Sequence, residues 1–455
     1  MYVYFLGLLP VESATAEGLK ETLLSFLYSL GLTDKIMKVQ FVGFCSDGAS
    51  TMTGQHNGLA ALLTANYPLI KPFHCMAHRL ELAVKNATDT VNSVSHFRDL
   101  VDGVYKVYSM SPKNQREIEM IAGSLSVELM KVQKVFDVRW VFSSFMSVTA
   151  LLRDLPALYE HFNKLSSPES DRSGKEKSKY SRLAKKLRSW FVVAEACMLK
   201  DALRSLKQLS LYMQGDDASV LDAHMHVNAT KLQLLAFKDG KGKTLLKFLS
   251  CFESSNTFKG LCIEKSASDE AKFITLRNQF FQALHDNISS RFPATSLMSA
   301  ATVLVKATWP EDPLERALFG EAEVAYLCKQ FAFAGAQAAE IVLDFSMHKQ
   351  GKAMTTKLRN FVQILQVLPV SSAACERGFS QMNLHHTAVR NRLAVTTLHN
   401  LLMISINGPC LREWNVNKYA LSWLRTGRHG ALDKPTGKGK SSSTKEVKKA
   451  AKLFA

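Results

Sequence analysis

The chain lacks a long apolar run and a regular cysteine framework. It contains no stretch of roughly eighteen apolar residues, so an ordinary transmembrane helix is excluded and no membrane partner is expected. The eight cysteines are scattered along 455 residues, which suits a reducing compartment better than a secreted disulfide scaffold. The apolar first residues follow no basic segment, so we expect a buried strand there rather than a signal peptide.

Acidic residues are in the minority. Asp plus Glu number 40 against 57 Lys plus Arg, and the formal net charge is +17. This balance favours an anionic partner, either nucleic acid or an acidic protein surface. The alternative is that the basic excess lies only in the tail, residues 425–455, which is rich in Lys, Gly and Ser and is expected to be disordered.

The first ninety residues alternate between strand and helix patterns. Leucines at helical spacing follow an N-cap at Thr15 and stop before Gly31, and another helix is expected over residues 76–87. Apolar, β-branched runs predict three short strands, at Tyr2–Leu9, Lys38–Cys45 and Ile70–Cys75. This order of elements is typical of an α/β layer.

Helical periodicity dominates after residue 90. We expect helices over Val91–Ser109, Asn114–Val132, Phe142–Leu165, Arg182–Tyr212 and Ala271–Ser289. A polar stretch, Ser166–Ser181, predicts an exposed loop, and Asp239–Lys243 predicts a turn. Near the end we expect a last strand at Val362–Val370, a helix from about Ala373 and a leucine-rich helix at Ala394–Ile406. The sequence thus divides into an α/β part at 1–150, a helical insertion at 151–350, a second α/β part at 351–424 and the tail.

Two acidic residues stand out because each lies in a mostly apolar or small-residue segment. Asp47 follows a predicted buried strand, where it is either a metal ligand or a turn aspartate that caps the next helix. Glu376 either binds a divalent metal together with Asp47 or forms an ion pair with Arg377. From local sequence alone, the turn and ion-pair interpretations are favoured.

Other candidate residues are weaker signals. The spacing His-Cys-x-x-His at residues 74–78 makes Cys75 and His78 candidate zinc ligands, but no second ligand pair lies at a suitable distance. The alternative is that one histidine caps a helix or bonds a carboxylate such as Asp47. Basic and aromatic side chains suited to phosphate or base contacts are Arg139, Trp140, Arg390 and Arg392. The alternative is a solvated basic face with Trp140 in the core.

The order of these motifs is more specific than any one of them. FCSDGASTMTG at Phe44–Gly54 precedes HCMAHRLELAVK at His74–Lys85. An Arg-Trp pair, a long helical region and LPVSSAACERGFSQMNLHHTAVRNR at Leu368–Arg392 follow. This arrangement resembles the hAT transposase superfamily, most strongly over residues 38–87 and 362–408. The resemblance implies a ribonuclease H-like mixed sheet, incomplete at its N-terminal edge, interrupted by a large helical insertion and mostly α overall.

The resemblance also implies residue roles. Asp47 matches the family's second catalytic acid and Glu376 matches the third. Cys75 and His78 match a motif near the active site, and Trp140 matches a tryptophan that attends the DNA end. The dimerisation block spans residues 380–406, with contact residues Leu398, Leu401, Leu402 and Ile406. The alternative is that these apolar side chains pack inside the protomer.

One departure from the family decides the functional expectation. Upstream of Asp47 the acids are Glu12, Glu17, Glu21 and Asp34, and none lies in a strand like the one that carries the family's first acid. Two-metal catalysis needs carboxylates gathered around the ions, so we expect loss of strand cleavage and no cofactor. With the resemblance and the net charge, this predicts a nuclear, homodimeric, transposase-derived protein that binds nucleic acid. The alternatives are a Mg- or Mn-dependent nuclease whose first acid is supplied elsewhere, and a nuclear protein–protein adaptor.

Overall fold

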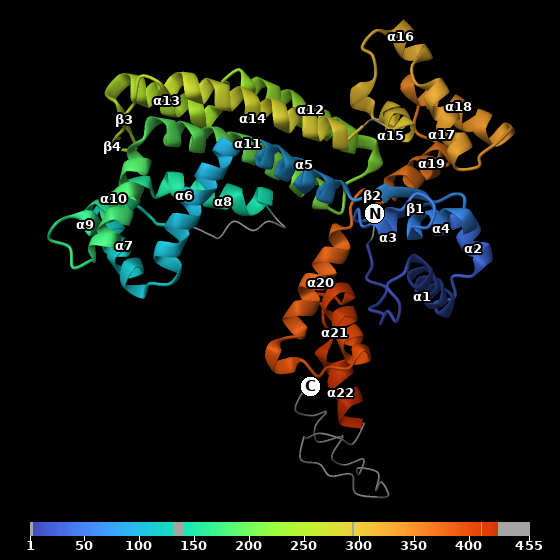
Figure 1. Cartoon of the computed structure of the whole chain (residues 1–455). Coiled ribbons are helices and arrows are strands. Elements are labelled where there is room, and N and C mark those ends of the chain that lie inside the picture. Colours follow the sequence, from blue (N-terminus) through green and yellow to red (C-terminus); the bar gives the residue numbers. More distant parts are fainter. Residues whose placement is uncertain (1–2, 131–139, 294, 411, 426–455) are drawn as a thin grey trace, which may run out of the picture. The chain divides into compact units, whose positions relative to one another are not determined.

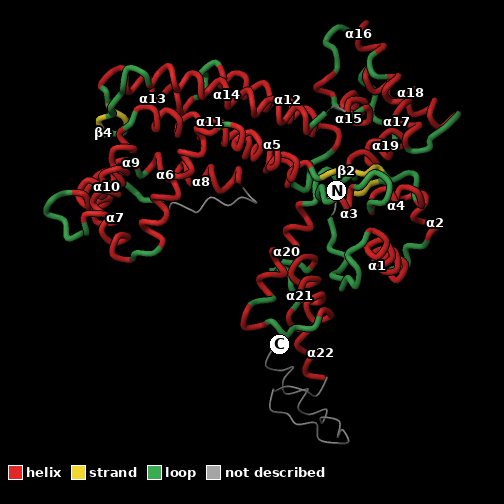
Figure 2. Tube along the Cα trace, in the orientation of Figure 1, coloured by secondary structure: helices red, strands yellow, loops and turns green. Residues whose placement is uncertain are grey.

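The computed structural model describes residues 3–130, 140–293, 295–410 and 412–425. These residues are mostly helical, with a small parallel sheet and one short hairpin (Figure 2). Contacts divide the chain into two compact units. The large unit contains Val11–Arg377 with Met1–Val3, and the small unit contains Gly378–Ala455 with Tyr4–Pro10. The predicted tail lies outside the described residues from position 426 onward.

The N-terminal part of the large unit is the predicted α/β layer. Strands β1 (Gly43–Ser46) and β2 (Lys71–His74) pair in parallel, with Ser46 opposite His74. Both strands therefore end at the same edge. The helices of this part are α1 (Ala16–Ser29), α2 (Asp34–Gln40), α3 (Ser50–Thr53) and α4 (Leu59–Asn66). A small core joins α1 to α4 through Leu27, Leu63 and Tyr67.

The rest of the large unit is helical (Figure 1). The first group of helices comprises α5 (Met76–Thr90), α6 (Asn92–Ser109), α7 (Pro112–Ser124), α8 (Trp140–Arg153), α9 (Leu155–Ser166), α10 (Gly174–Arg188), α11 (Trp190–Gln214), α12 (Val220–Lys238), α13 (Lys243–Ser255) and α14 (Asp269–Arg291). The hairpin strands β3 (Thr257–Phe258) and β4 (Leu261–Cys262) separate the last two helices.

A second group of shorter helices follows. Its members are α15 (Ser296–Ala301), η1 (Thr302–Leu304), η2 (Lys306–Thr308), α16 (Pro313–Leu318), α17 (Glu321–Gln330), α18 (Ala336–Lys349) and α19 (Thr356–Gln366). Helix α11 packs on α8, α12 and α13, while α14 packs on α5 and α12. One apolar core runs from Cys75 to Val370. It therefore crosses both boundaries, at 150 and 350, that the sequence suggested for the insertion.

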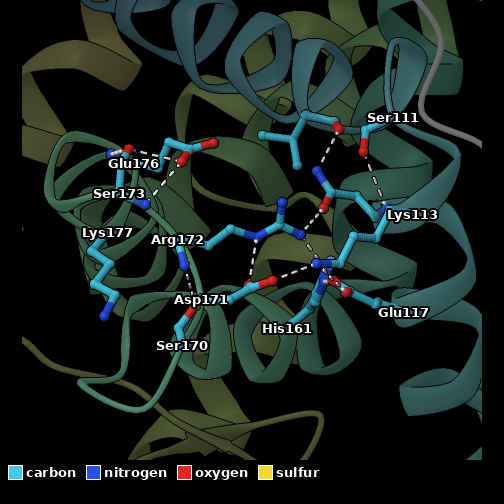
Figure 3. A network of polar contacts seen from close by, with 12 residues as sticks. Ser111, Lys113, Glu117, His161, Ser170, Asp171, Arg172, Ser173, Glu176 and Lys177 are labelled. Carbon is cyan, nitrogen blue, oxygen red and sulfur yellow. Dashed lines mark hydrogen bonds and ion pairs between the residues drawn. The ribbon is translucent and has the colours of Figure 1, made fainter.

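Only the first half of the polar stretch Ser166–Ser181 is the exposed loop that we expected, because residues 167–173 form no helix and most of them are exposed. Its second half forms the start of α10, where Ser173 and Glu176 make a reciprocal capping box. Arg172 donates hydrogen bonds to Asn114 (2.7 Å) and Glu117 (3.3 Å) of α7. Glu117 also contacts the buried His161 of α9, as Figure 3 shows. Polar composition predicted a solvated loop throughout, but residues 174–181 are helical and Arg172 connects the loop before them to α7.

Three predicted strands need correction. Residues 3–10 form no strand, because their backbone groups bond to side chains of α21 instead of to another strand. The side chain of Asn407 accepts the N–H of Phe5 and donates to its carbonyl, and the ring of His399 accepts the N–H of Leu8. The run Lys38–Cys45 becomes strand only from Gly43, because residues 34–40 form α2 and bury Met37. Val362–Val370 is mainly the end of α19, whose apolar side chains follow helical spacing.

Several predicted helices have different bounds. The run Phe142–Leu165 is two helices, α8 and α9, separated at Asp154, whose carboxylate accepts the backbone N–H of Met130. Arg182–Tyr212 is likewise divided between α10 and α11. The predicted helix Asn114–Val132 ends at Ser124. Other predictions are confirmed: Thr15 caps α1, Gly31 follows it with φ of 83°, and residues 239–242 form a turn before α13.

The small unit contains the remaining helices. These are the greater part of α20 (Ala373–His385), η3 (Ala388–Arg390), α21 (Val395–Asn407) and α22 (Val416–Arg425). The helix predicted from Ala373 and the helix predicted at Ala394–Ile406 are both confirmed. Within the described residues no single helix is long and apolar enough to cross a membrane. Only the bent pair Val141–Arg153 and Leu155–Ser166 passes such a test when its halves are combined.

Candidate functional site at the ends of two parallel strands

Three segments distant in sequence meet at the buried Cys75. The N–H of Cys75 donates to the carbonyl of Ser46 (2.8 Å), at the end of β1. The sulfur of Cys75 accepts the N–H of Ser372 (3.3 Å) and lies 3.6 Å from the hydroxyl of Ser371. The next residue, Met76, donates to the carbonyl of Val370 (2.9 Å). The segment that leads into α20 is therefore fixed against the ends of both strands.

Asp47 and Glu376 belong to the two segments that contact Cys75. Asp47 directly follows Ser46, and its carboxylate accepts the N–H of Ala49 (3.2 Å), as in an Asx turn. Glu376 lies in the first turn of α20, and its N–H donates to the carbonyl of Ser372 (3.2 Å). Both residues are exposed to solvent, so the apolar surroundings expected from sequence are not found. We call Asp47, His74, Cys75 and Glu376 the strand-end site.

The cysteines at this junction perturb one another. Cys45 lies in β1 opposite Phe73, so its side chain is on the same face of the sheet as that of Cys75. Hydrogen bonds from Cys45 and Ser372 lower the pKa of the Cys75 thiol to about 4. The bond to Cys75, together with burial, raises the pKa of Cys45. Cys75 therefore serves as the hydrogen-bonded centre of the junction.

His74 begins the His-Cys-x-x-His spacing, but its close contact with the turn after β1 was not predicted from the sequence. A Cβ on Gly48 would lie 2.6 Å from the imidazole of His74, so only glycine permits this approach of the turn after β1 to the ring. The Nε2 atom of His74 is buried without a hydrogen-bond partner in the described structure. Burial, with the charges of Arg79 and His78, lowers its pKa. The parallel register of the two strand ends is the signal that could have identified it.

Arg377 does not depend on its neighbour Glu376 for an anionic partner. Its guanidinium forms an ion pair with Asp216 and donates to the carbonyl of Gln214 (2.6 Å). These contacts connect the start of α20 to the loop after α11. A cavity of about 410 Å³ lies beside them and is lined by β1, this loop and residues 367–377. The pairing of Arg377 is therefore tertiary rather than local.

The strand-end site gathers part of a metal-binding arrangement. Asp47 and Glu376 offer carboxylate oxygens on adjoining segments. Over the residues that the structure describes, however, no group of three or more His, Cys, Asp or Glu side chains is placed to hold a metal ion. His78 lies near His74, with ring centroids 5.9 Å apart, while the sulfur of Cys75 is directed to Cys45 and Ser372.

Among the described residues, no contact joins the predicted nucleic-acid-binding residues to Cys75 or its neighbours. Arg139 lies outside the described residues. Trp140 is the first residue of α8, next to Val141, whose N–H donates to Glu81 of α5 (3.2 Å). Arg390 and Arg392 lie in and after η3 in the small unit, where both are exposed.

The predicted dimerisation residues divide into two groups. Leu398 and Leu402 are buried, and Leu401 is half-buried, so they stabilise the protomer. Ile406 is exposed, as are large apolar side chains on all three helices of the small unit and on η3. They are Phe379, Leu384, Val389, Ile404, Val416, Tyr419 and Trp423. Leucine spacing predicted the helix correctly but did not distinguish its inner face from its outer face.

A search against protein-family models finds no match to this chain.

Proposed function

We propose that this chain is a nuclear, transposase-derived protein of the hAT type that self-associates through its small unit and binds nucleic acid. Its large unit is then a ribonuclease H-like scaffold around β1 and β2 that has lost strand cleavage. The observation that carries this proposal is the junction at Cys75. It joins two motif segments that are 297 residues apart in sequence. Descent from a hAT transposase, whose second and third catalytic acids lie in these two segments, explains why they meet.

Self-association is supported by the surface of the small unit. Val389 is 91% exposed, Phe379 is 57% exposed and Ile404 is 53% exposed. Clusters of large exposed apolar side chains typically mark contacts with another protein. A second copy of the same unit offers the same apolar residues, as an isologous interface requires.

Nucleic-acid binding is supported by the net charge of +17 and by exposed arginines of the small unit, among them Arg390 and Arg392. Arginine side chains bind phosphate oxygens through a planar set of donors. Such contacts release counterions, so binding weakens steeply as salt concentration rises. The rival adaptor function predicts partner binding that is insensitive to salt and no affinity for DNA.

Fluorescence anisotropy with a labelled DNA duplex, measured over a range of salt concentrations, tests the binding function. We expect the parent to bind with a steep salt dependence. Replacement of two of these arginines, Arg390→Glu with Arg392→Glu, should weaken binding and reduce the logarithmic salt slope by about two. The matched control is Arg116→Glu with Arg182→Glu, which reverses two exposed arginines of the large unit.

A plasmid-nicking assay with Mg or Mn separates the binding function from catalysis. We expect no metal-dependent nicking by the parent, and we expect Asp47→Ala with Glu376→Ala to bind DNA as the parent does. Nicking that disappears in this double variant would establish the nuclease alternative. Absence of any salt-sensitive DNA binding would contradict the proposed function and favour the adaptor.

A further inference from the structure

A second cavity lies in the large unit, among the helices α16 and α18 and the 3-10 helix η2. Its volume is about 430 Å³, and its lining includes Lys306, Trp309, Arg316, His348, Lys349 and Lys352. No acidic residue lines it. We call this cavity the basic pocket.

One cation of the basic pocket is paired with a carboxylate, because the ammonium of Lys349 lies 3.7 Å from Glu321. The other three are not. Among the described residues, no ion pair involves Lys306, Arg316 or Lys352. The guanidinium of Arg316 is instead held by backbone carbonyls of residues 310 (2.7 Å) and 311 (3.0 Å). Neutral partners fix its orientation without cancelling its charge, so its field remains available to an anion.

The base and wall of the pocket are rigid. Lys349 is buried, and its ammonium donates to the carbonyls of Ala317 (3.1 Å) and Phe319 (2.5 Å). Trp309 is fixed by a hydrogen bond from its indole N–H to the carbonyl of Val303 (2.8 Å). His348 packs edge-on against this indole, and its Nδ1 donates to the carbonyl of Lys352 (2.9 Å). The pocket therefore holds its shape before any ligand arrives, which lowers the entropic cost of binding.

The geometry points to the basic pocket as a phosphate-binding site that accepts a phosphodiester of nucleic acid or a free polyphosphate. Several unneutralised cations around one cavity suit an anion with more than one charge. A guanidinium held in a fixed orientation and two flanking ammonium groups match phosphate oxygens in number and charge. As a site for nucleic acid, the basic pocket rests on the proposed nucleic-acid binding. As a site for free polyphosphate, it is independent of that proposal.

Two probes test the site in parallel: calorimetry with tripolyphosphate and anisotropy with a labelled DNA duplex. The pocket variant is Lys306→Glu with Lys352→Glu. Its matched control is Lys272→Glu with Lys329→Glu, which makes the same charge change at exposed lysines outside the pocket. Circular dichroism confirms that both variants fold. We expect the pocket variant to lose about tenfold or more in affinity, while the control stays within about twofold.

The outcomes separate the two sources of phosphate. Loss of affinity for both probes in the pocket variant alone assigns the site to phosphate groups in general, nucleic acid included. A pocket-dependent loss for tripolyphosphate alone assigns it to a free polyphosphate, even if the proposed DNA binding fails. A loss for DNA alone assigns it to the phosphodiester. Equal behaviour of pocket variant and control with both probes, or no binding of either probe by the parent, overturns the site.

Discussion

Two buried carboxylates of α11 have opposite surroundings. Asp201 accepts the N–H groups of Thr244 (2.9 Å) and Leu245 (3.0 Å) at the start of α13, so it satisfies the free donors of that helix. Glu195 is only 1% exposed, and its Oε1 has no hydrogen-bond partner in the described structure. Burial raises the pKa of Glu195 to about 8. Asp201 therefore stabilises the fold, whereas Glu195 makes its stability depend on pH.

Glu195→Gln should stabilise the protein in alkaline solution. The unfolded chain loses the Glu195 proton near pH 4.5, while the folded chain keeps it up to about pH 8, so the parent loses stability as pH rises between these values. Glutamine stays neutral throughout. We expect the variant's advantage in the free energy of unfolding to grow across this range by on the order of 3 kcal/mol, measured by urea denaturation.

The matched control for this prediction is Glu253→Gln, which changes an exposed carboxylate on α13. Its stability difference from the parent should not change with pH in the same range. If Glu195→Gln tracks the parent at every pH as this control does, the carboxyl of Glu195 is not kept neutral by burial.

Helices with caps were predictable from sequence, whereas of the four predicted short strands only Ile70–Cys75 (β2) and the end of Lys38–Cys45 (β1) are confirmed. Thr15 and Gly31 mark the two ends of α1 because an N-cap oxygen and a left-handed glycine act locally. The apolar run Val362–Val370 has no such local marker. A short apolar run fits a buried strand or one face of a helix equally well. In the structure, residues up to Gln366 are helical because the apolar side chains of α19 pack into the core at helical spacing.

We predict that self-association uses the exposed faces of α20 and α21. We expect Phe379→Asp with Ile404→Asp to convert a dimer to a monomer in light scattering, because both side chains are exposed and apolar. Leu402→Asp should instead destabilise the small unit by about 3 kcal/mol or more, since Leu402 is 1% exposed and a carboxylate there would be buried.

A suitable control places the same charges on the large unit, with Leu246→Asp and Leu343→Asp at exposed apolar positions of α13 and α18. This variant should keep the parent's oligomeric state. A parent that is monomeric, or a dimer that survives the Phe379 and Ile404 changes with its circular dichroism unaltered, contradicts self-association through these faces.

Over the whole chain, the residues of the strand-end site were more predictable than their surroundings. Motif order identified Asp47, Cys75 and Glu376, whose segments the structure joins through Ser46 and Ser372. The exposure of Asp47 and Glu376 could not be predicted, because apolar neighbours in sequence can point to the opposite side of a strand or helix end. The basic pocket was missed altogether, because Lys306, Arg316 and Lys352 are brought together only by tertiary packing.

The junction at Cys75 is the claim on which the proposed function depends, and cross-linking measures it most directly. The hydroxyl of Ser371 lies 3.6 Å from the sulfur of Cys75, so a sulfur placed there needs only a small shift to form a disulfide. The test protein carries Ser371→Cys with Cys45→Ser and Cys375→Ser, which remove the competing thiols. After mild oxidation and proteolysis, mass spectrometry should find the Cys75 peptide linked to the peptide of the introduced cysteine. An introduced cysteine that stays free in the folded, oxidised protein would contradict the junction.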